Sequence, residues 1–206
     1  MRYLAFSFSK KAIFTVCLVI CFLQLSAQSV TIPIETKDHV ILLQTDRNNV
    51  LRTVYVGKPL MTSSEYSMAS TLNRLDDENV GIFNAAYTPS GTWNISEPAI
   101  QVKHTDGNPS LELKYVNHSQ EQVDGNSTLT KILLKDNVYP FQVTLFYKVW
   151  KNENVIEQWT EILHQEKKPV LLQKYASANL YFANRDFYLT TFHGKWAKEM
   201  QPVETK

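Results

Sequence analysis

Apolar and polar residues alternate along much of the chain after Val30, as in β-strands that bury one face. The clearest run places five apolar residues on one face of a single strand: Phe141, Val143, Leu145, Tyr147 and Val149. The opposite face of that strand is polar: Gln142, Thr144 and Lys148. The same alternation predicts a strand through Leu111–Tyr115, and longer runs predict strands over Val155–Leu163 and Val170–Phe182.

Turn-forming residues separate these runs. Asp106–Pro109 lies between Ile100–Thr105 and Ser110–Val116, and its Asp-Gly-Asn-Pro sequence predicts a hairpin. Asp124–Asn126 and Asn152–Asn154 predict two further short connections. Successive strands joined in this way indicate an all-β fold, in which antiparallel sheets pack as a sandwich.

The segment Met61–Trp93 is polar, and it includes Pro89 and Gly91. We expect a long excursion from the sheets, with a short helix near Tyr66–Leu75. Long loops in compact domains are often functional, but a solvated surface loop has the same composition. Both interpretations stay open.

Residues 1–27 have the features of a secretory signal peptide. Arg2, Lys10 and Lys11 precede an apolar run over Ala12–Leu23, and small residues at Ser26 and Ala27 precede a cleavage point before Gln28. A membrane-spanning helix needs about 20 apolar residues, more than this run supplies. We expect an exported, periplasmic or secreted protein that has no membrane contact after cleavage.

Both cysteines lie inside this segment, so the expected mature chain of 28–206 relies on a hydrophobic core and has no disulfides. Its 179 residues are enough for one domain. They carry 18 basic and 20 acidic residues with no basic stripe, which argues against a nucleic-acid partner. Aromatic residues make up 12% of the chain, which suits a β-rich core or a sugar-binding surface.

Four sequence blocks, in order, point to one family. They are His39–Gly57, Glu97–Leu113, Val155–Ile162 and Tyr188–Met200. Over Thr31–Val203 the chain resembles the amino-terminal domain of family 36 glycoside hydrolases, the α-galactosidases. The resemblance implies a large β-sandwich of the galactose-mutarotase-like supersandwich type.

In that family a (β/α)₈ barrel with two catalytic aspartates and a small β domain follow the sandwich. The enzymes cleave terminal α-galactose from oligosaccharides with retention and without a metal. Many are tetramers, in which the amino-terminal domain helps to build neighbouring active sites. A barrel takes about 200–250 residues, and twelve residues follow Gly194. The expectation is therefore a truncated sandwich, incomplete at its C-terminus, that lacks the catalytic barrel and is inactive alone.

No catalytic residue is predicted within the chain itself. A retaining glycosidase needs two carboxyl groups about 5–5.5 Å apart. Glu157 and Glu161 share a strand face, but four residues of strand separate their backbones by roughly 13 Å. His193 is interpreted as structural. The other histidines have no metal-ligand spacing, so neither a metal site nor a cofactor is expected.

One loop carries the predicted substrate contacts. In the resembling family an acidic or amide residue just before the Glu97-Pro98 pair often reaches the galactose pocket, and Asn94 stands at that position, where many relatives have Asp. An amide both donates to and accepts from a sugar hydroxyl. Trp93 offers an apolar face to a pyranose ring. A turn role for Asn94 and core burial for Trp93 remain alternatives.

The leading hypothesis is thus the non-catalytic front part of an exported α-galactosidase. It would support the barrel, line the pocket rim and help form a homo-oligomer, a tetramer, that acts on galactoside oligosaccharides. The alternative is a free-standing carbohydrate-binding β-sandwich module. Such a module needs an exposed aromatic platform, with four candidates: Trp93, Trp150, Trp159 and Trp196. A sugar mutarotase ranks last, because the sequence fixes no pair of His and Glu.

Overall fold

The structure, a computed structural model, describes residues 29–69, 76–77, 81–82, 84–91, 94–182 and 188–206. The predicted signal segment 1–27 and Trp93 lie outside the described residues. In the described part the fold is almost entirely antiparallel β. No helix there is long and apolar enough to cross a membrane.

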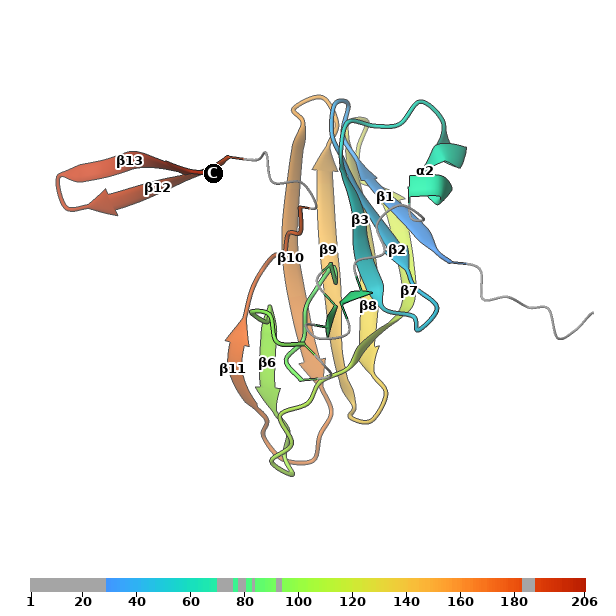
Figure 1. The fold of residues 1–206 in the computed structure, drawn as a ribbon, viewed down its shortest axis with the longest axis vertical. Coiled ribbons are helices and arrows are strands. Elements are labelled where there is room, and N and C mark those ends of the chain that lie inside the picture. The colour runs from blue at the N-terminus through green and yellow to red at the C-terminus, as the bar shows by residue number, and fades with distance from the viewer. Residues whose placement is uncertain (1–28, 70–75, 78–80, 83, 92–93, 183–187) are drawn as a thin grey trace, which may run out of the picture. The chain divides into compact units, whose positions relative to one another are not determined.

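A four-stranded sheet forms the largest layer, with the order β10-β9-β8-β7 (Figure 1). Its strands are β7 (Leu113–Gln122), β8 (Ser127–Asp136), β9 (Phe141–Trp150) and β10 (Val155–His164). The connections are tight because polar side chains hold them. The Asp124 carboxylate accepts hydrogen bonds from the backbone N–H groups of Asn126 and Ser127, at 2.8 and 2.7 Å. Asn154, in the β9–β10 turn, adopts a left-handed φ of 55°.

A second sheet has the order β1-β2-β3. Its strands are β1 (Thr31–Glu35), β2 (Val40–Thr45) and β3 (Leu51–Gly57), and a bulge lies between Leu42 and Leu43. Asp46 shapes the turn between β2 and β3, because its Oδ1 accepts from the N–H groups of Asn48 and Val50 at 2.8 and 2.9 Å.

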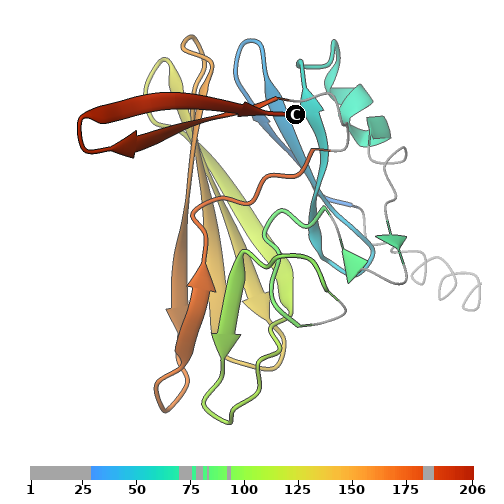
Figure 2. The ribbon, with the colours of Figure 1, turned by 60° about the vertical axis from the view of Figure 1, so that its left-hand side comes forward.

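A short pair joins β6 (Ile100–Lys103) to β11 (Leu171–Tyr175) (Figure 2). The predicted hairpin at Asp106–Pro109 is therefore wrong. The chain does turn there, since the His104 N–H donates to the Asn108 carbonyl at 2.9 Å. However, β6 on one side pairs with β11, and β7 on the other side pairs with β8.

The predicted strand Val170–Phe182 is too long, because β11 ends at Tyr175. Beyond it the chain leaves strand geometry to bind the 84–88 segment. The Tyr87 hydroxyl donates to the Ala176 carbonyl at 2.7 Å, and the Asn179 amide donates to the Ala85 carbonyl at 2.9 Å. These tertiary bonds replace the ladder that a longer strand would need.

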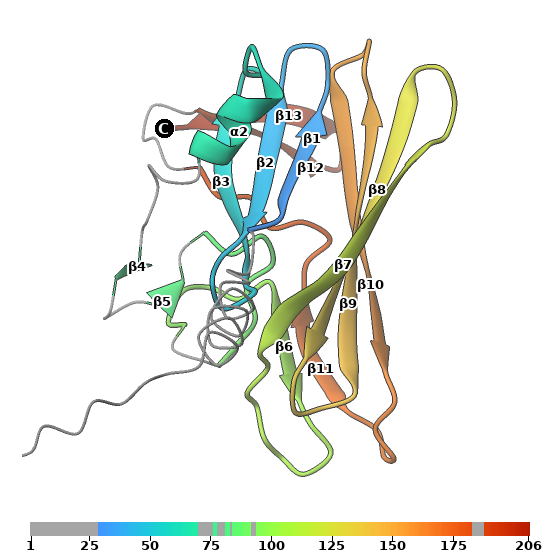
Figure 3. The same ribbon diagram turned by 90° about the vertical axis from the view of Figure 1, so that its right-hand side faces the viewer.

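The two larger sheets pack as the layers of a sandwich (Figure 3). Backbone bonds tie them at both ends: the Lys37 N–H donates to the Lys151 carbonyl at 3.1 Å, and the Tyr115 N–H donates to the Asn49 carbonyl at 2.8 Å. The core between the layers holds side chains that are at most 2% exposed: Ile34, Ile132, Phe141, Val143 and Leu145. Val40 and Leu42 point to the other face of their sheet, where they pack with Val54 and Tyr66. The all-β sandwich is confirmed, and so is the inward face predicted for 141–149.

The excursion after β3 is only partly a surface loop. It contains α2 (Ser63–Ala69), which begins before the predicted helix, and the two-residue strands β4 (Asp76–Asp77) and β5 (Gly81–Ile82). Ala85, Ala86 and Tyr87 are at most 3% exposed. The Ala86 N–H donates to the Leu51 carbonyl at 2.9 Å, so this stretch continues the edge of β3 into the core.

The last described segment is a separate hairpin of β12 (Leu189–Lys195) and β13 (Lys198–Thr205). Its turn contains Trp196, which is 96% exposed, and Ala197, whose φ is 60°. Apolar side chains elsewhere on the hairpin are also exposed: Leu189, Phe192, Met200 and Val203.

Candidate functional site

Asn94 lies in a loop that its own side chain holds together. The Asn94 Nδ2 group donates to the Pro89 carbonyl at 3.2 Å, and Oδ1 accepts from the Ser96 N–H and Ser96 hydroxyl at 3.2 and 2.6 Å. The turn role considered for Asn94 is therefore present in the structure. One of its two amide hydrogens has no partner among the described residues, so a donor to a sugar hydroxyl remains. Its substrate role stays a prediction.

The loop is anchored through Gly91, which has a φ of 87°. The Ser90 N–H donates to the Ile100 carbonyl at 2.9 Å, and the Leu111 N–H donates to the Ser90 carbonyl at 3.1 Å. A Cβ atom on Gly91 would lie 2.8 Å from the Ser110 Cα atom, which is too close. Both the backbone angle and the contact therefore require glycine here.

We expect Gly91→Ala to lower the free energy of unfolding by more than about 1 kcal/mol, because alanine is strained at this φ and meets backbone at Ser110. Urea denaturation measures the change. Gly125→Ala is the matched control, since a Cβ atom there has nothing within 4 Å, and it should stay within about 0.5 kcal/mol of the unaltered chain. Equal losses at both glycines would show that the Gly91 loop is not packed as described.

A buried polar cluster links the 104–110 turn to the segment between β10 and β11. His104 Nδ1 lies 2.7 Å from Glu166 Oε1, and their side chains are 0% and 4% exposed. His104 Nε2 lies 3.1 Å from the Ser110 carbonyl oxygen. Tyr139 stacks on the imidazole with ring centroids 3.6 Å apart and an interplanar angle of 6°. Sequence patterns did not indicate this pair, because 62 residues separate its members.

Hydrogen bonds set the charge state of Glu166. Burial alone opposes ionisation, but the bonds from His104 and from the Thr105 N–H, at 3.0 Å, outweigh it and lower the pKa of Glu166. A hydrogen bond from the Asn108 N–H, and another from the Tyr139 hydroxyl, lower the pKa of the neighbouring Asp106. The cluster thus favours carboxylates at neutral pH.

Because the folded-state pKa of Glu166 is depressed, its stabilising contribution is present above the ordinary glutamate value of 4.5 and is lost as the pH falls through the lower folded value. We therefore expect the unfolding free energy to drop in acid more steeply for the unaltered chain than for Glu166→Gln. Urea titrations between pH 3 and pH 7 compare the two slopes. If the unfolding free energies of the two proteins change with pH in parallel, Glu166 does not have a lowered pKa in the folded state.

The polar groups of the cluster are bonded to one another and to the backbone. Both imidazole nitrogens of His104 contact protein acceptors, and the partner carboxylate also holds the Thr105 N–H. In the described part, every buried side-chain nitrogen or oxygen has a hydrogen-bond partner. The pair therefore does not supply the His and Glu that a mutarotase would direct at its substrate.

The remaining sequence candidates are separated in space or exposed. Glu157 and Glu161 lie on the solvent-facing side of β10, opposite Lys148 and Thr144 of β9. His193 is exposed on β12, where its Nε2 lies 3.2 Å from the Thr191 hydroxyl. No group of three His, Cys, Asp or Glu side chains in the described residues is placed to hold a metal.

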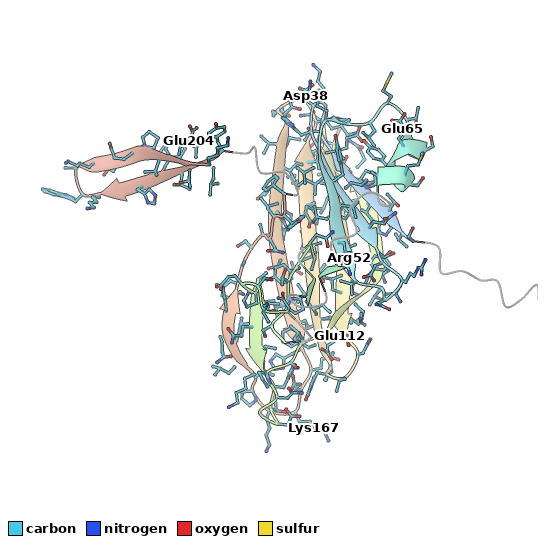
Figure 4. All side chains as sticks on the ribbon, in the orientation of Figure 1. Asp38, Arg52, Glu65, Glu112, Lys167 and Glu204 are labelled. Carbon is cyan, nitrogen blue, oxygen red and sulfur yellow. The ribbon has the colours of Figure 1, made fainter. Side chains whose placement is uncertain are left out.

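Arg52 marks a second polar junction, labelled in Figure 4. Its guanidinium contacts Asp46 Oδ2 at 2.8 Å and donates to Asn84 Oδ1 at 3.0 Å. The Asn84 amide in turn donates to the Thr53 carbonyl at 3.1 Å. All of these groups are paired within the protein, so the junction fixes the 84–88 segment against β3.

The family model of the glycosyl hydrolase family 36 N-terminal domain matches residues 49–206. The chain belongs to this family. The match contains the Asn94 loop, the His104–Glu166 pair and both strands of the last hairpin.

Two α-galactosidases are similar to this chain in sequence. Alpha-galactosidase 1 of Pediococcus pentosaceus is 29% identical over 131 residues, and alpha-galactosidase Mel36A of Lactobacillus acidophilus is 24% identical over 127 residues. These alignments cover 56% and 55% of this chain but 18% and 17% of the relatives.

Solved structures give the same picture. The family 36 α-galactosidase AgaA from Geobacillus stearothermophilus superimposes with a TM-score of 0.72 at 19% identity, over 85% of this chain and 28% of its own. The α-galactosidase from Lactobacillus brevis gives 0.71 at 18% identity, over 88% and 28%. The likeness establishes the sandwich fold, and the chain spans less than a third of these enzymes.

Proposed function

We propose that this chain is the non-catalytic amino-terminal part of an exported α-galactosidase that hydrolyses terminal α-galactosides in carbohydrate metabolism. The observation that carries the proposal is the family 36 N-terminal domain match over residues 49–206. A retaining glycosidase needs a close pair of carboxyl groups. The two glutamates of β10, four residues apart on one strand, do not supply that geometry.

Support for a neighbouring catalytic domain is the first role we assign. Large apolar side chains remain exposed at and after β11: Leu171, Leu172, Tyr175, Leu180 and Phe182. Exposed apolar patches of this kind are typical of surfaces that are covered by another domain or subunit. In the assembled enzyme we expect them to pack on the barrel or between the subunits of a tetramer.

Lining the pocket rim is the second role, and it falls on Asn94. In an enzyme that contains both this chain and the barrel, Asn94→Ala should raise KM for an aryl α-galactoside and for raffinose. Ser96→Ala is the matched control, because it removes a bond to Asn94 Oδ1 and leaves the amide in place. A KM unchanged by Asn94→Ala, or raised equally by Ser96→Ala, would refute direct contact with the substrate. Trp93→Ala tests the neighbouring prediction in the same assay.

A carbohydrate-binding module is the second candidate, favoured by one exposed and one half-buried tryptophan. Trp196 is 96% exposed, and Trp159 stacks on Phe146 with ring centroids 4.9 Å apart on the solvent-facing side of the sheet. Calorimetric titration of the isolated chain with galactose and raffinose separates the two functions. Tight binding supports the module, whereas no measurable heat supports the scaffold.

Export rests on residues 1–27. Expression in a bacterial host and amino-terminal sequencing of the recovered protein test it. A mature chain that begins at Gln28 in the periplasm or medium supports export, and an intact chain retained in the cytoplasm opposes it.

A further inference from the structure

Strand β10 is an open edge of the four-stranded sheet. It pairs with β9 along all ten residues, from Val155 opposite Trp150 to His164 opposite Phe141. Within the described residues no strand pairs with its other side, as Figure 1 shows. Alternate residues of an antiparallel edge strand direct N–H and C=O groups away from the sheet. A free edge of this length is a template for an added strand.

The solvent-facing side chains of β10 have a distinctive order. They are Val155, Glu157, Trp159, Glu161 and Leu163. The outer two are 47% and 50% exposed, and both glutamates are exposed. The edge therefore presents an acidic, an aromatic and a second acidic position, with an apolar residue beyond each end.

Neither glutamate is neutralised by the described residues. Lys148 lies opposite Glu157 on β9, but its Nζ atom lies 4.5 Å from the Trp150 ring centroid and forms no ion pair with Glu157. Glu161 faces Thr144, which has no charge. Two uncompensated carboxylates four residues apart are a charge pattern that a basic partner complements.

The apolar groups of β10 are also incompletely covered. Phe146 stacks on one face of Trp159 at an interplanar angle of 7°, so the other face is turned away from β9. On the inner side, Ile156 and Ile162 are half-buried, although the β9 residues opposite them, Val149 and Val143, are 2% and 0% exposed. A strand added beside β10 would cover Trp159 on the outer face of the sheet, and Ile156 and Ile162 on the inner face.

A second copy of the chain fits this edge poorly. When two antiparallel copies of β10 pair about Trp159, Glu157 of each lies opposite Glu161 of the other. Like charges directly opposite each other destabilise a strand pair. The two glutamates thus oppose self-pairing while leaving the edge open to a strand of opposite charge.

We propose that the free edge of β10 binds an extended polypeptide segment that has two basic side chains four residues apart, with an apolar side chain midway between them. The basic residues would face Glu157 and Glu161, and the apolar residue would cover Trp159. The segment's backbone would continue the β10-β9-β8-β7 ladder. On its inner face, apolar side chains of the segment would cover Ile156 and Ile162. This inference does not depend on the proposed function.

Two labelled ten-residue peptides test the proposal with the full chain. On one face, both peptides have valine at the positions opposite Ile156 and Ile162 and threonine at the other positions. On the other face, one peptide reads leucine, lysine, valine, lysine, leucine, and its counterpart has glutamate in place of each lysine. Fluorescence anisotropy at low salt should show at least tenfold tighter binding of the lysine peptide, and added salt should reduce the difference. Equal binding of the two peptides, or none, would overturn the proposal.

Charge reversal on the protein provides the decisive comparison. Glu157→Lys with Glu161→Lys should invert the preference, so that the glutamate peptide binds more tightly. The control Glu121→Lys with Glu199→Lys makes the same change in net charge away from β10 and should keep the original preference. If the control variant also prefers the glutamate peptide, the effect of charge is non-specific and β10 is not the binding site. The peptide comparison on the unaltered chain stands even if the β10 variant fails to fold.

Light scattering of the unaltered chain addresses the competing occupant. A monomer agrees with the charge argument. A dimer that is disrupted by Glu157→Lys with Glu161→Lys would assign the edge to a second copy and overturn the proposal.

Discussion

Glu166→Ala is expected to lower the free energy of unfolding by about 1–3 kcal/mol, because it leaves a buried imidazole nitrogen of His104 without its hydrogen-bond partner. The imidazole is fully buried, and Glu166 is its carboxylate contact at 2.7 Å. The substitution also removes the acceptor of the Thr105 N–H. Urea denaturation at neutral pH, followed by circular dichroism, measures the loss.

Glu112→Ala is the matched control for that experiment. Glu112, labelled in Figure 4, pairs with Lys114 at 2.6 Å, but its side chain is 45% exposed. Exposed ion pairs contribute at most about 1 kcal/mol. If Glu166→Ala lowers stability no more than Glu112→Ala does, the buried pair does not tie the 104–110 turn to the segment after β10.

Leu145→Ala is expected to lower the unfolding free energy by about 2–5 kcal/mol, because it opens a cavity between the two sheets. Leu145 is 0% exposed and lies between Ile132 of β8 and Thr160 of β10 in the strand register. Urea denaturation again measures the free energy of unfolding, from the midpoint and the slope of the transition. Leu163→Ala removes the same atoms from a side chain that is 50% exposed on β10, and it should change stability by less than about 1 kcal/mol. Similar losses at both leucines would contradict the sandwich core.

Period-two patterning predicted the central strands well. The alternation of inward and outward side chains and the turn-forming side chains are both local features of the sequence. In β9, inward residues alternate with outward ones over ten positions, and the turns at 124–126 and 152–154 use side chains that bond their own backbone. Neither feature needs information from distant parts of the chain. The family followed from four blocks in order, and the domain match over 49–206 confirms it.

Long-range pairing explains what the sequence pattern missed. The turn at Asp106–Pro109 is local, but the choice of β11 as the partner of β6 depends on residues about 70 positions away. The same holds for the end of β11, where Tyr87 and Asn179 replace a strand ladder with side-chain bonds. Asn84–Thr88 is buried although it lies within the Met61–Trp93 segment, whose polar composition predicted an excursion from the sheets.

In the candidate site, too, local contacts were predictable from the sequence and long-range contacts were not. The turn chemistry of Asn94 was open to prediction because its partners, Pro89 and Ser96, lie within five residues. The His104–Glu166 pair was not, because no spacing rule connects two side chains 62 residues apart. The glutamates of β10 were visible as a polar strand face, but their position on an open sheet edge required the strand order.

Turnover of an aryl α-galactoside by the purified, folded chain is the most direct test of a scaffold role. Circular dichroism first establishes the β-structure, and an intact family 36 α-galactosidase serves as the active control. We predict no release of the aryl group above the buffer rate, because the two glutamates of β10 do not form the close carboxyl pair that glycoside cleavage needs. Clear turnover that co-purifies with the chain would contradict the account.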